Sequence, residues 1–125
     1  MKASQLHTRT LANQGISKPI PFPDGTPTGQ FVTILGIDSD SFKKAARLAN
    51  RERARINELP EDEREDAHMA NRNVMMASLV TGWTLEDECT QEAVIDLFEN
   101  APEFLKLVDD EANDRSNFFN KPSKS

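Results

Sequence analysis

The glycine and proline residues of this 125-residue chain are concentrated towards its N-terminus, which limits where helices can form. Four of the five glycines and four of the seven prolines lie within residues 1–37. Both residue types are unfavourable inside a helix, because glycine is conformationally free and proline lacks a backbone donor. We therefore expect strands and turns before residue 38 and helices after it.

Two strand-like segments in this first part predict a β-hairpin over residues 17–36. Residues 17–22 alternate between apolar and polar side chains, and residues 30–35 are rich in β-branched and aromatic side chains. Between them, the sequence PDG at residues 23–25 is typical of a turn. An isolated hairpin is only marginally stable, so we expect this one to pack on a helix or on another chain.

The spacing of apolar residues predicts about four helices in the rest of the chain, so the expected fold class is mainly α with a small β-hairpin (α+β). Serine and aspartate at residues 38–41 begin the first helix, and Pro60 ends it. Gly82 ends the second helix, Thr90 caps the third, and Pro102 lies in the first turn of the fourth. The expected helices span about 39–58, 61–81, 90–99 and 102–118.

The length of the chain suits one small domain. We expect an N-terminal arm at residues 1–15 that need not be ordered, a single domain at 16–119, and a flexible polar tail at 120–125. The arm lacks the apolar segment of a secretory signal, and no stretch reaches the roughly 20 apolar residues of a membrane span. One cysteine, Cys89, excludes an intramolecular disulfide and is typical of a reducing cytoplasm.

No set of residues predicts a catalytic, cofactor or metal site, and we expect a protein that is not an enzyme. The two histidines, His7 and His68, are far apart in the sequence, and His68 is interpreted as a residue at the edge of the core. Cys89 follows three carboxylates at residues 86–88, which should raise the pKa of its thiol and disfavour a nucleophile. The acidic run at 109–114 lacks the glycine of a calcium loop and is interpreted as a solvated helical surface.

Charge is distributed unevenly along the chain. Residues 41–57 contain six basic side chains and one acid, whereas residues 84–114 contain eleven acids and one lysine. The first interpretation is two solvated surfaces that neutralise each other. Alternatively, the basic helix at residues 43–55 binds an acidic partner or nucleic acid, or copies of the chain stack head to tail. The net charge of −6, and the lack of aromatic residues between the basic ones, argue against nucleic acid as the main partner.

The second expected helix carries a stripe of methionines. Such a stripe is usually part of a core, but methionine also adapts to varied binding partners. Contacts with a partner, or between copies in a homo-oligomer, are therefore predicted for part of this stripe, for the hairpin and for the basic helix. The candidate residues are Met69, Met75, Met76, Phe31, Ile34, Arg51 and Arg55.

Four stretches of the sequence carry a resemblance to a known family. They are PFPDGTPTG at 21–29, GIDSDSF at 36–42, ASLVTGW at 77–83, and a segment from Thr90 through Ala101-Pro102 to DRSNF at 114–118. Their order and spacing resemble the tail assembly chaperones of long-tailed bacteriophages and prophages, over roughly residues 15–119. The chain departs from the family in the compact segment at 84–89, where relatives often have a longer one.

The resemblance implies a function that involves no catalysis. Members of this family coat the long, aggregation-prone tape measure protein in the host cytoplasm. The major tail (tube) protein then displaces them, and they are absent from the mature virion. The resemblance therefore implies a chain that binds and solubilises the tape measure protein and helps to recruit tail tube subunits, with no cofactor. The alternatives are a structural minor tail or tail-completion protein, and a small nucleic-acid-binding regulator that uses residues 43–55.

Overall fold

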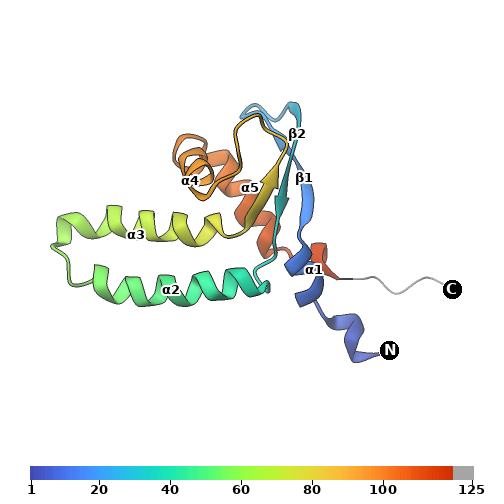
Figure 1. The fold of residues 1–125 in the computed structure, drawn as a ribbon, viewed down its shortest axis with the longest axis horizontal. Coiled ribbons are helices and arrows are strands. Elements are labelled where there is room, and N and C mark those ends of the chain that lie inside the picture. Colours follow the sequence, from blue (N-terminus) through green and yellow to red (C-terminus); the bar gives the residue numbers. More distant parts are fainter. Residues whose placement is uncertain (120–125) are drawn as a thin grey trace.

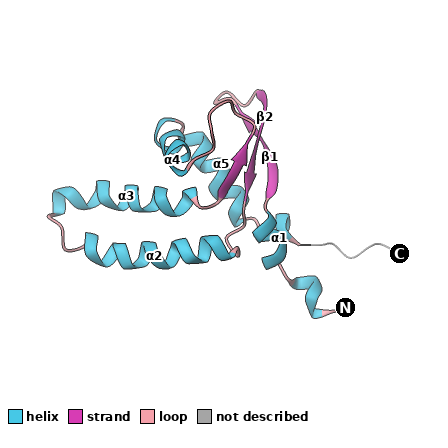
Figure 2. Ribbon diagram, in the orientation of Figure 1, coloured by secondary structure: helices cyan, strands magenta, loops and turns pink. Residues whose placement is uncertain are grey.

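The structure, a computed structural model, describes residues 1–119 and confirms the α+β class (Figure 1). Its sheet has three antiparallel strands in the order β1-β2-β3 (Figure 2). The strands β1 (Ile16–Pro21) and β2 (Pro27–Ile34) form the expected hairpin, with Pro19 opposite Phe31. Because β1 is an edge strand, the missing N–H groups of its prolines do not interrupt the sheet.

Two long helices between β2 and β3 form an antiparallel helical hairpin that projects away from the sheet (Figure 1). The helices are α2 (Asp40–Ile56) and α3 (Glu61–Ala77). The start of α2 is the one that the sequence predicts, because the hydroxyl of Ser39 accepts a hydrogen bond from the backbone N–H of Phe42, at 3.3 Å.

The third strand, β3 (Val80–Trp83), was not expected from the sequence, which predicts a helix as far as residue 81. The helix α3 ends at Ala77, and β3 pairs with β2 so that Val32 lies opposite Trp83. Valine, threonine and tryptophan are good strand formers, and pairing satisfies backbone groups that β2 would otherwise leave open. The helical spacing of apolar residues that continues to Val80 therefore does not indicate a helix there. The β-hairpin pairs with β3 through β2.

Two further helices, α4 (Gln91–Asn100) and α5 (Pro102–Asn113), cover one face of the sheet (Figure 1). Thr90 caps α4 as predicted, since its side chain accepts a hydrogen bond from the N–H of Ala93 at 3.1 Å. The rings of Phe98 and Phe104 lie 5.7 Å apart between these helices. The core is built from both helices, the inner face of the sheet and the end of α3, and includes Val32, Ile34, Met76, Leu79, Val94, Phe98, Phe104 and Val108.

The helix α5 ends at Asn113, earlier than the expected end at residue 118. The carboxylate of Asp114 accepts hydrogen bonds from both the backbone N–H and the hydroxyl of Ser116. Such a local turn competes with continuation of the helix. The chain then forms a short 3-10 helix, η2 (Arg115–Phe118).

The first 15 residues contain a 3-10 helix, η1 (Ala3–Leu6), and a helix, α1 (Arg9–Gln14). Ala12 of α1 is buried, and its backbone carbonyl accepts a hydrogen bond from the N–H of Gly36. The expected tail at residues 120–125 lies outside the described residues. None of the helices within residues 1–119 is both long and apolar enough to cross a bilayer.

Asp38 joins three parts of the chain just before α2. The hydroxyl of Thr8 donates a hydrogen bond to the Asp38 carboxylate at 2.6 Å, and the guanidinium of Arg115 donates two, at 2.8 and 3.1 Å. Two of the four stretches behind the family resemblance, residues 36–42 and 114–118, therefore meet in space. Their contacts, together with Thr8, hold segments near both ends of the described chain against the start of α2.

This junction predicts a loss of stability in acid. The hydrogen bonds from Arg115 and Thr8 lower the pKa of Asp38 from its ordinary value of 3.8 to about 2. Because the folded-state pKa is the lower one, the stabilisation is complete above about pH 5 and is lost as the pH falls towards 2. Replacing Asp38 by asparagine is expected to lower the free energy of unfolding by about 1–2 kcal/mol at pH 7. This loss is smaller than the full pKa shift would give, because the guanidinium of Arg115 is exposed and water weakens its interaction with the carboxylate.

Urea unfolding at a series of pH values measures this difference. The gap between wild type and Asp38→Asn is expected to narrow as the pH approaches 2. The control is Asp87→Asn, because among the described residues the exposed Asp87 carboxylate forms no hydrogen bond or ion pair. A gap that stays constant from neutral to acid pH would show that the Asp38 carboxylate does not supply the stabilisation.

Candidate partner-binding groove

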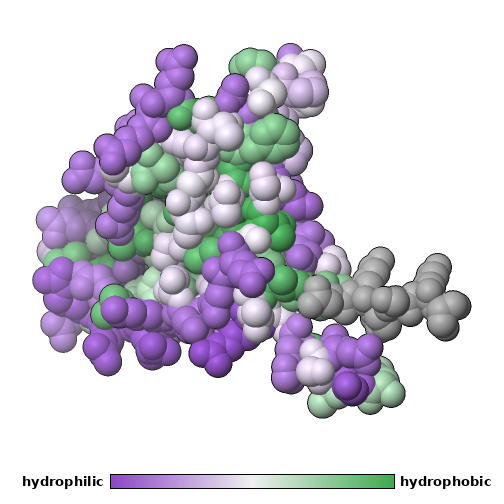
Figure 3. Space-filling model, turned by 45° about the vertical axis from the view of Figure 1, so that its right-hand side comes forward, coloured by the Kyte–Doolittle hydropathy of each residue, from purple (hydrophilic) through white to green (hydrophobic). Residues whose placement is uncertain are grey.

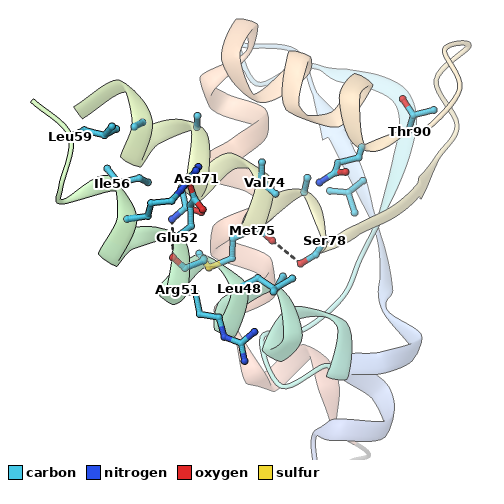
Figure 4. A pocket seen from close by; sticks show the side chains of 18 of the residues that line it. Leu48, Arg51, Glu52, Ile56, Leu59, Asn71, Val74, Met75, Ser78 and Thr90 are labelled. Carbon is cyan, nitrogen blue, oxygen red and sulfur yellow. Dashed lines mark hydrogen bonds and ion pairs between the residues drawn. The ribbon is translucent and has the colours of Figure 1, made fainter. Parts of the chain in front are cut away.

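An apolar groove runs along one side of the helical hairpin and ends at the start of α4 (Figure 4). Its volume is about 1200 Å³. Figure 4 shows Ile56 and Leu59 near the loop that joins α2 to α3, and Thr90 at the opposite end. The lining side chains come from α2 (Ala45, Leu48, Ala49, Arg51, Glu52, Arg55 and Ile56), from α3 (Ala67, Ala70, Asn71, Val74, Met75 and Ala77), and from Leu59, Ser78, Val80, Cys89, Thr90 and Gln91.

Small side chains on α3 keep the groove open. Ala67, Ala70 and Ala77 recur at spacings of three and seven residues, so they lie on one side of that helix. The two helices stay close beneath the groove because the side-chain amide of Asn71 donates a hydrogen bond to the backbone carbonyl of Ala49 at 3.0 Å. The alanines thus leave a hollow between the two helices, where larger side chains would fill the space.

Two large apolar side chains line the groove and face solvent. Leu48 of α2 is 53 % exposed and Val74 of α3 is 48 % exposed. Between them Met75 is half-buried. Apolar side chains gathered in a hollow of this size are typical of a binding site. Elsewhere on the outside of the helical hairpin the surface is mostly hydrophilic (Figure 3).

One edge of the groove is basic. Arg51 lines the groove, and the exposed Lys44 and Arg47, which are not among its lining residues, precede it on the same side of α2 at spacings of three and four residues. Among residues 1–119 none of the three forms an ion pair. Arg55, further along, donates a hydrogen bond to Glu52 at 3.0 Å. The free positive charge of this edge therefore comes from the first three residues.

The structure brings three of the predicted partner-binding residues together, because Met75, Arg51 and Arg55 all line the groove. The other exposed candidates lie elsewhere. Phe31 is on the open face of the sheet, opposite Pro19, and Met69 is on α3 but does not line the groove.

Two of the predicted partner-binding residues are buried in the core, where a partner cannot reach their side chains. Ile34 is fully buried and Met76 is 6 % exposed. Ile34 is three residues from Phe31, and residues an odd number apart on a strand point to opposite faces. Met76 follows Met75 by one residue, which turns its side chain about 100° around the helix, away from the groove.

Leu48 and Val74, the most exposed apolar residues of the groove, were not predicted as binding residues. A signal for Leu48 is present in the sequence, since a leucine between Arg47 and Arg51 interrupts a charged stretch of α2. Val74 gives no such signal, because it belongs to the same apolar spacing as the buried residues of α3. Only the position of α2 distinguishes it from them.

Cys89 lines the groove, and its side chain is partly buried. The pKa of the Cys89 thiol is raised, as expected, but the cause is burial of the side chain and not the neighbouring carboxylates. Within residues 1–119, no three histidine, cysteine, aspartate or glutamate side chains gather in a way that could hold a metal ion. What the arrangement can do is bind an apolar surface beside a row of positive charges.

Comparison of the chain with protein-family models, curated proteins and solved structures finds no match.

Proposed function

We propose that this chain is a tail assembly chaperone, which binds and solubilises the phage tape measure protein in the host cytoplasm and helps to recruit tail tube subunits. The resemblance of the four sequence stretches supports the proposal. The observation that carries it is the open apolar groove between α2 and α3, which exposes Leu48 and Val74. Such a groove can cover a sticky segment of another chain without any covalent step. Many copies would bind along a long client through repeated weak contacts.

Co-expression tests this proposal. The tape measure protein of the same phage is produced with and without the chain, and its soluble fraction is compared. We expect a clear rise in the soluble fraction when the chain is present, because covered apolar surface no longer aggregates. An equal soluble fraction in the two cultures would show that the chain is not a chaperone of this client.

The alternative within phage tail proteins is a structural minor tail or tail-completion protein. Mass spectrometry of purified mature particles distinguishes the two, because a chaperone is expected to be absent from them. A constant number of copies in every particle would favour the structural role.

The basic edge of α2 favours a second candidate function, binding of nucleic acid. DNA binding that weakens strongly with salt, and is lost when Arg51, Arg53 and Arg55 are reversed in charge, would support it. The apolar groove beside the edge and the net charge of −6 favour a protein client instead.

A further inference from the structure

The groove matches one α-helix in size. On α2 its lining residues extend from Ala45 to Ile56, about 16 Å at the rise of an α-helix, or three turns. A helix of that length and a diameter of about 10 Å occupies roughly 1300 Å³. The hollow, at about 1200 Å³, is of the same order and is open to solvent along one side, so a helix lying in it would be partly enclosed.

The walls of the groove favour a helix with a narrow apolar stripe. The alanines of α3 allow a close approach of a partner backbone, and Leu48 and Val74 offer large apolar side chains on opposite walls. An amphipathic helix with apolar residues at positions i, i+3, i+4 and i+7 presents one stripe of this width. A flat or extended partner would leave most of the hollow empty.

The charge of the groove is asymmetric, and this restricts the partner further. Lys44, Arg47 and Arg51 lie on one side of α2, whereas the α3 side of the groove has Ala70, with the exposed acids Asp66 and Glu63 four and seven residues before it on the same side of that helix. A helix that carries acids along one flank would place them beside the three basic side chains. Opposite charges across an interface increase specificity and the rate of association.

The acidic helices of a second copy do not fit this description. The helices α4 and α5 carry most of the acidic residues between 84 and 114, but their apolar sides are turned into the core through Phe98, Phe104 and Val108. They have no apolar stripe left to place in the groove of another copy. Charge and apolar surface together therefore argue against α4 and α5 of a second copy as the helix that occupies the groove.

We propose that the groove binds one amphipathic α-helix of a partner protein, with its apolar stripe against Leu48 and Val74 and a row of acidic residues beside Arg47 and Arg51. Only the identity of the partner, the tape measure protein, rests on the proposed function. The binding chemistry stands on the groove itself.

Fluorescence anisotropy with two labelled synthetic helices of about 18 residues tests the proposal. Both peptides carry one leucine stripe, and one flank is glutamate in the first peptide and lysine in the second. We expect the full chain to bind the glutamate peptide about tenfold more tightly, with a difference that shrinks as salt is added. The variant Arg47→Glu/Arg51→Glu is expected to reverse the preference.

A matched control has the same change in net charge outside the groove. The variant Lys2→Glu/Arg72→Glu replaces two exposed basic residues outside α2 that do not line the groove, and it is expected to keep the preference of the wild type. Equal reversal by both variants would overturn the proposal, because net charge and not the edge of α2 would then set the preference.

Three other outcomes would also overturn it: binding of neither peptide, equal binding of both, or a dimer of the chain that dissociates in a Leu48→Glu variant. The last of these would show that a second copy occupies the groove. The proposed function is tested separately. If co-expression solubilises the client while the peptides fail to bind, only the groove inference is wrong. If the glutamate peptide binds while the client stays insoluble, only the chaperone function is wrong.

Discussion

Replacing Phe118 by alanine is expected to lower the free energy of unfolding by about 3–5 kcal/mol. Phe118 is 1 % exposed and is the largest of the fully buried side chains among the described residues. Its ring lies against Gly36, where an added Cβ atom would come within 3.1 Å of the ring and 2.8 Å of the Cβ atom of Ala12. The variant would leave a cavity between α1, η2 and the segment that leads into α2.

Urea unfolding followed by circular dichroism measures this loss. The control is Phe22→Ala, because Phe22 is 54 % exposed near the tip of the β-hairpin and its truncation is expected to change stability by less than about 0.5 kcal/mol. A loss of less than about 1 kcal/mol for Phe118→Ala would contradict the packing of the C-terminal 3-10 helix against Gly36.

The elements that the sequence predicts correctly are those that local chemistry determines. The turn at Gly25, the Ser39 cap of α2 and the Thr90 cap of α4 depend on residues a few positions apart. These local predictions are correct because no contact with a distant part of the chain favours another conformation there.

The strand β3 depends instead on a distant partner. Val80–Trp83 becomes a strand because β2, almost fifty residues earlier in the chain, supplies the neighbouring edge. The premature end of α5 at Asn113 has a different cause, since it depends on the competition between a helix and a local turn at Asp114. Periodicity alone identifies neither.

The candidate site was predicted only in part, for a similar reason. The sequence points to α2, α3 and the hairpin as the elements that bind a partner, but it does not give the direction of each side chain. Met75 lines the groove and Met76 is in the core, although they are neighbours. The separation depends on how α3 is rotated against α2 and the sheet, which is a property of the tertiary packing.

Introducing charge into the groove is expected to abolish client binding. The double variant Leu48→Glu/Val74→Glu removes two half-exposed apolar side chains, whose remaining surface is worth roughly 0.8–1.5 kcal/mol each when a partner buries it, and it adds two carboxylates whose desolvation opposes binding. Affinity for the client is therefore expected to fall by more than about 100-fold. Because both side chains are about half exposed in the free chain, the variant is expected to fold with little loss of stability.

The matched control for this variant is Leu6→Glu/Phe22→Glu. Leu6 and Phe22 are 70 % and 54 % exposed, at least as exposed as Leu48 and Val74 at 53 % and 48 %, and they lie outside the groove. The control is expected to bind the client like the wild type in sedimentation or pull-down of purified proteins. Equal loss in both variants would show that exposed apolar residues act without regard to the groove.

The most direct measurement of the central claim is the light scattering of purified tape measure protein when it is diluted from denaturant into buffer. With a stoichiometric amount of the wild-type chain and no nucleotide, we expect scattering to stay low, whereas with the Leu48→Glu/Val74→Glu variant it should rise as in buffer alone. Scattering that rises equally with the wild-type chain, with the variant and without either would contradict the claim that this groove shields the client.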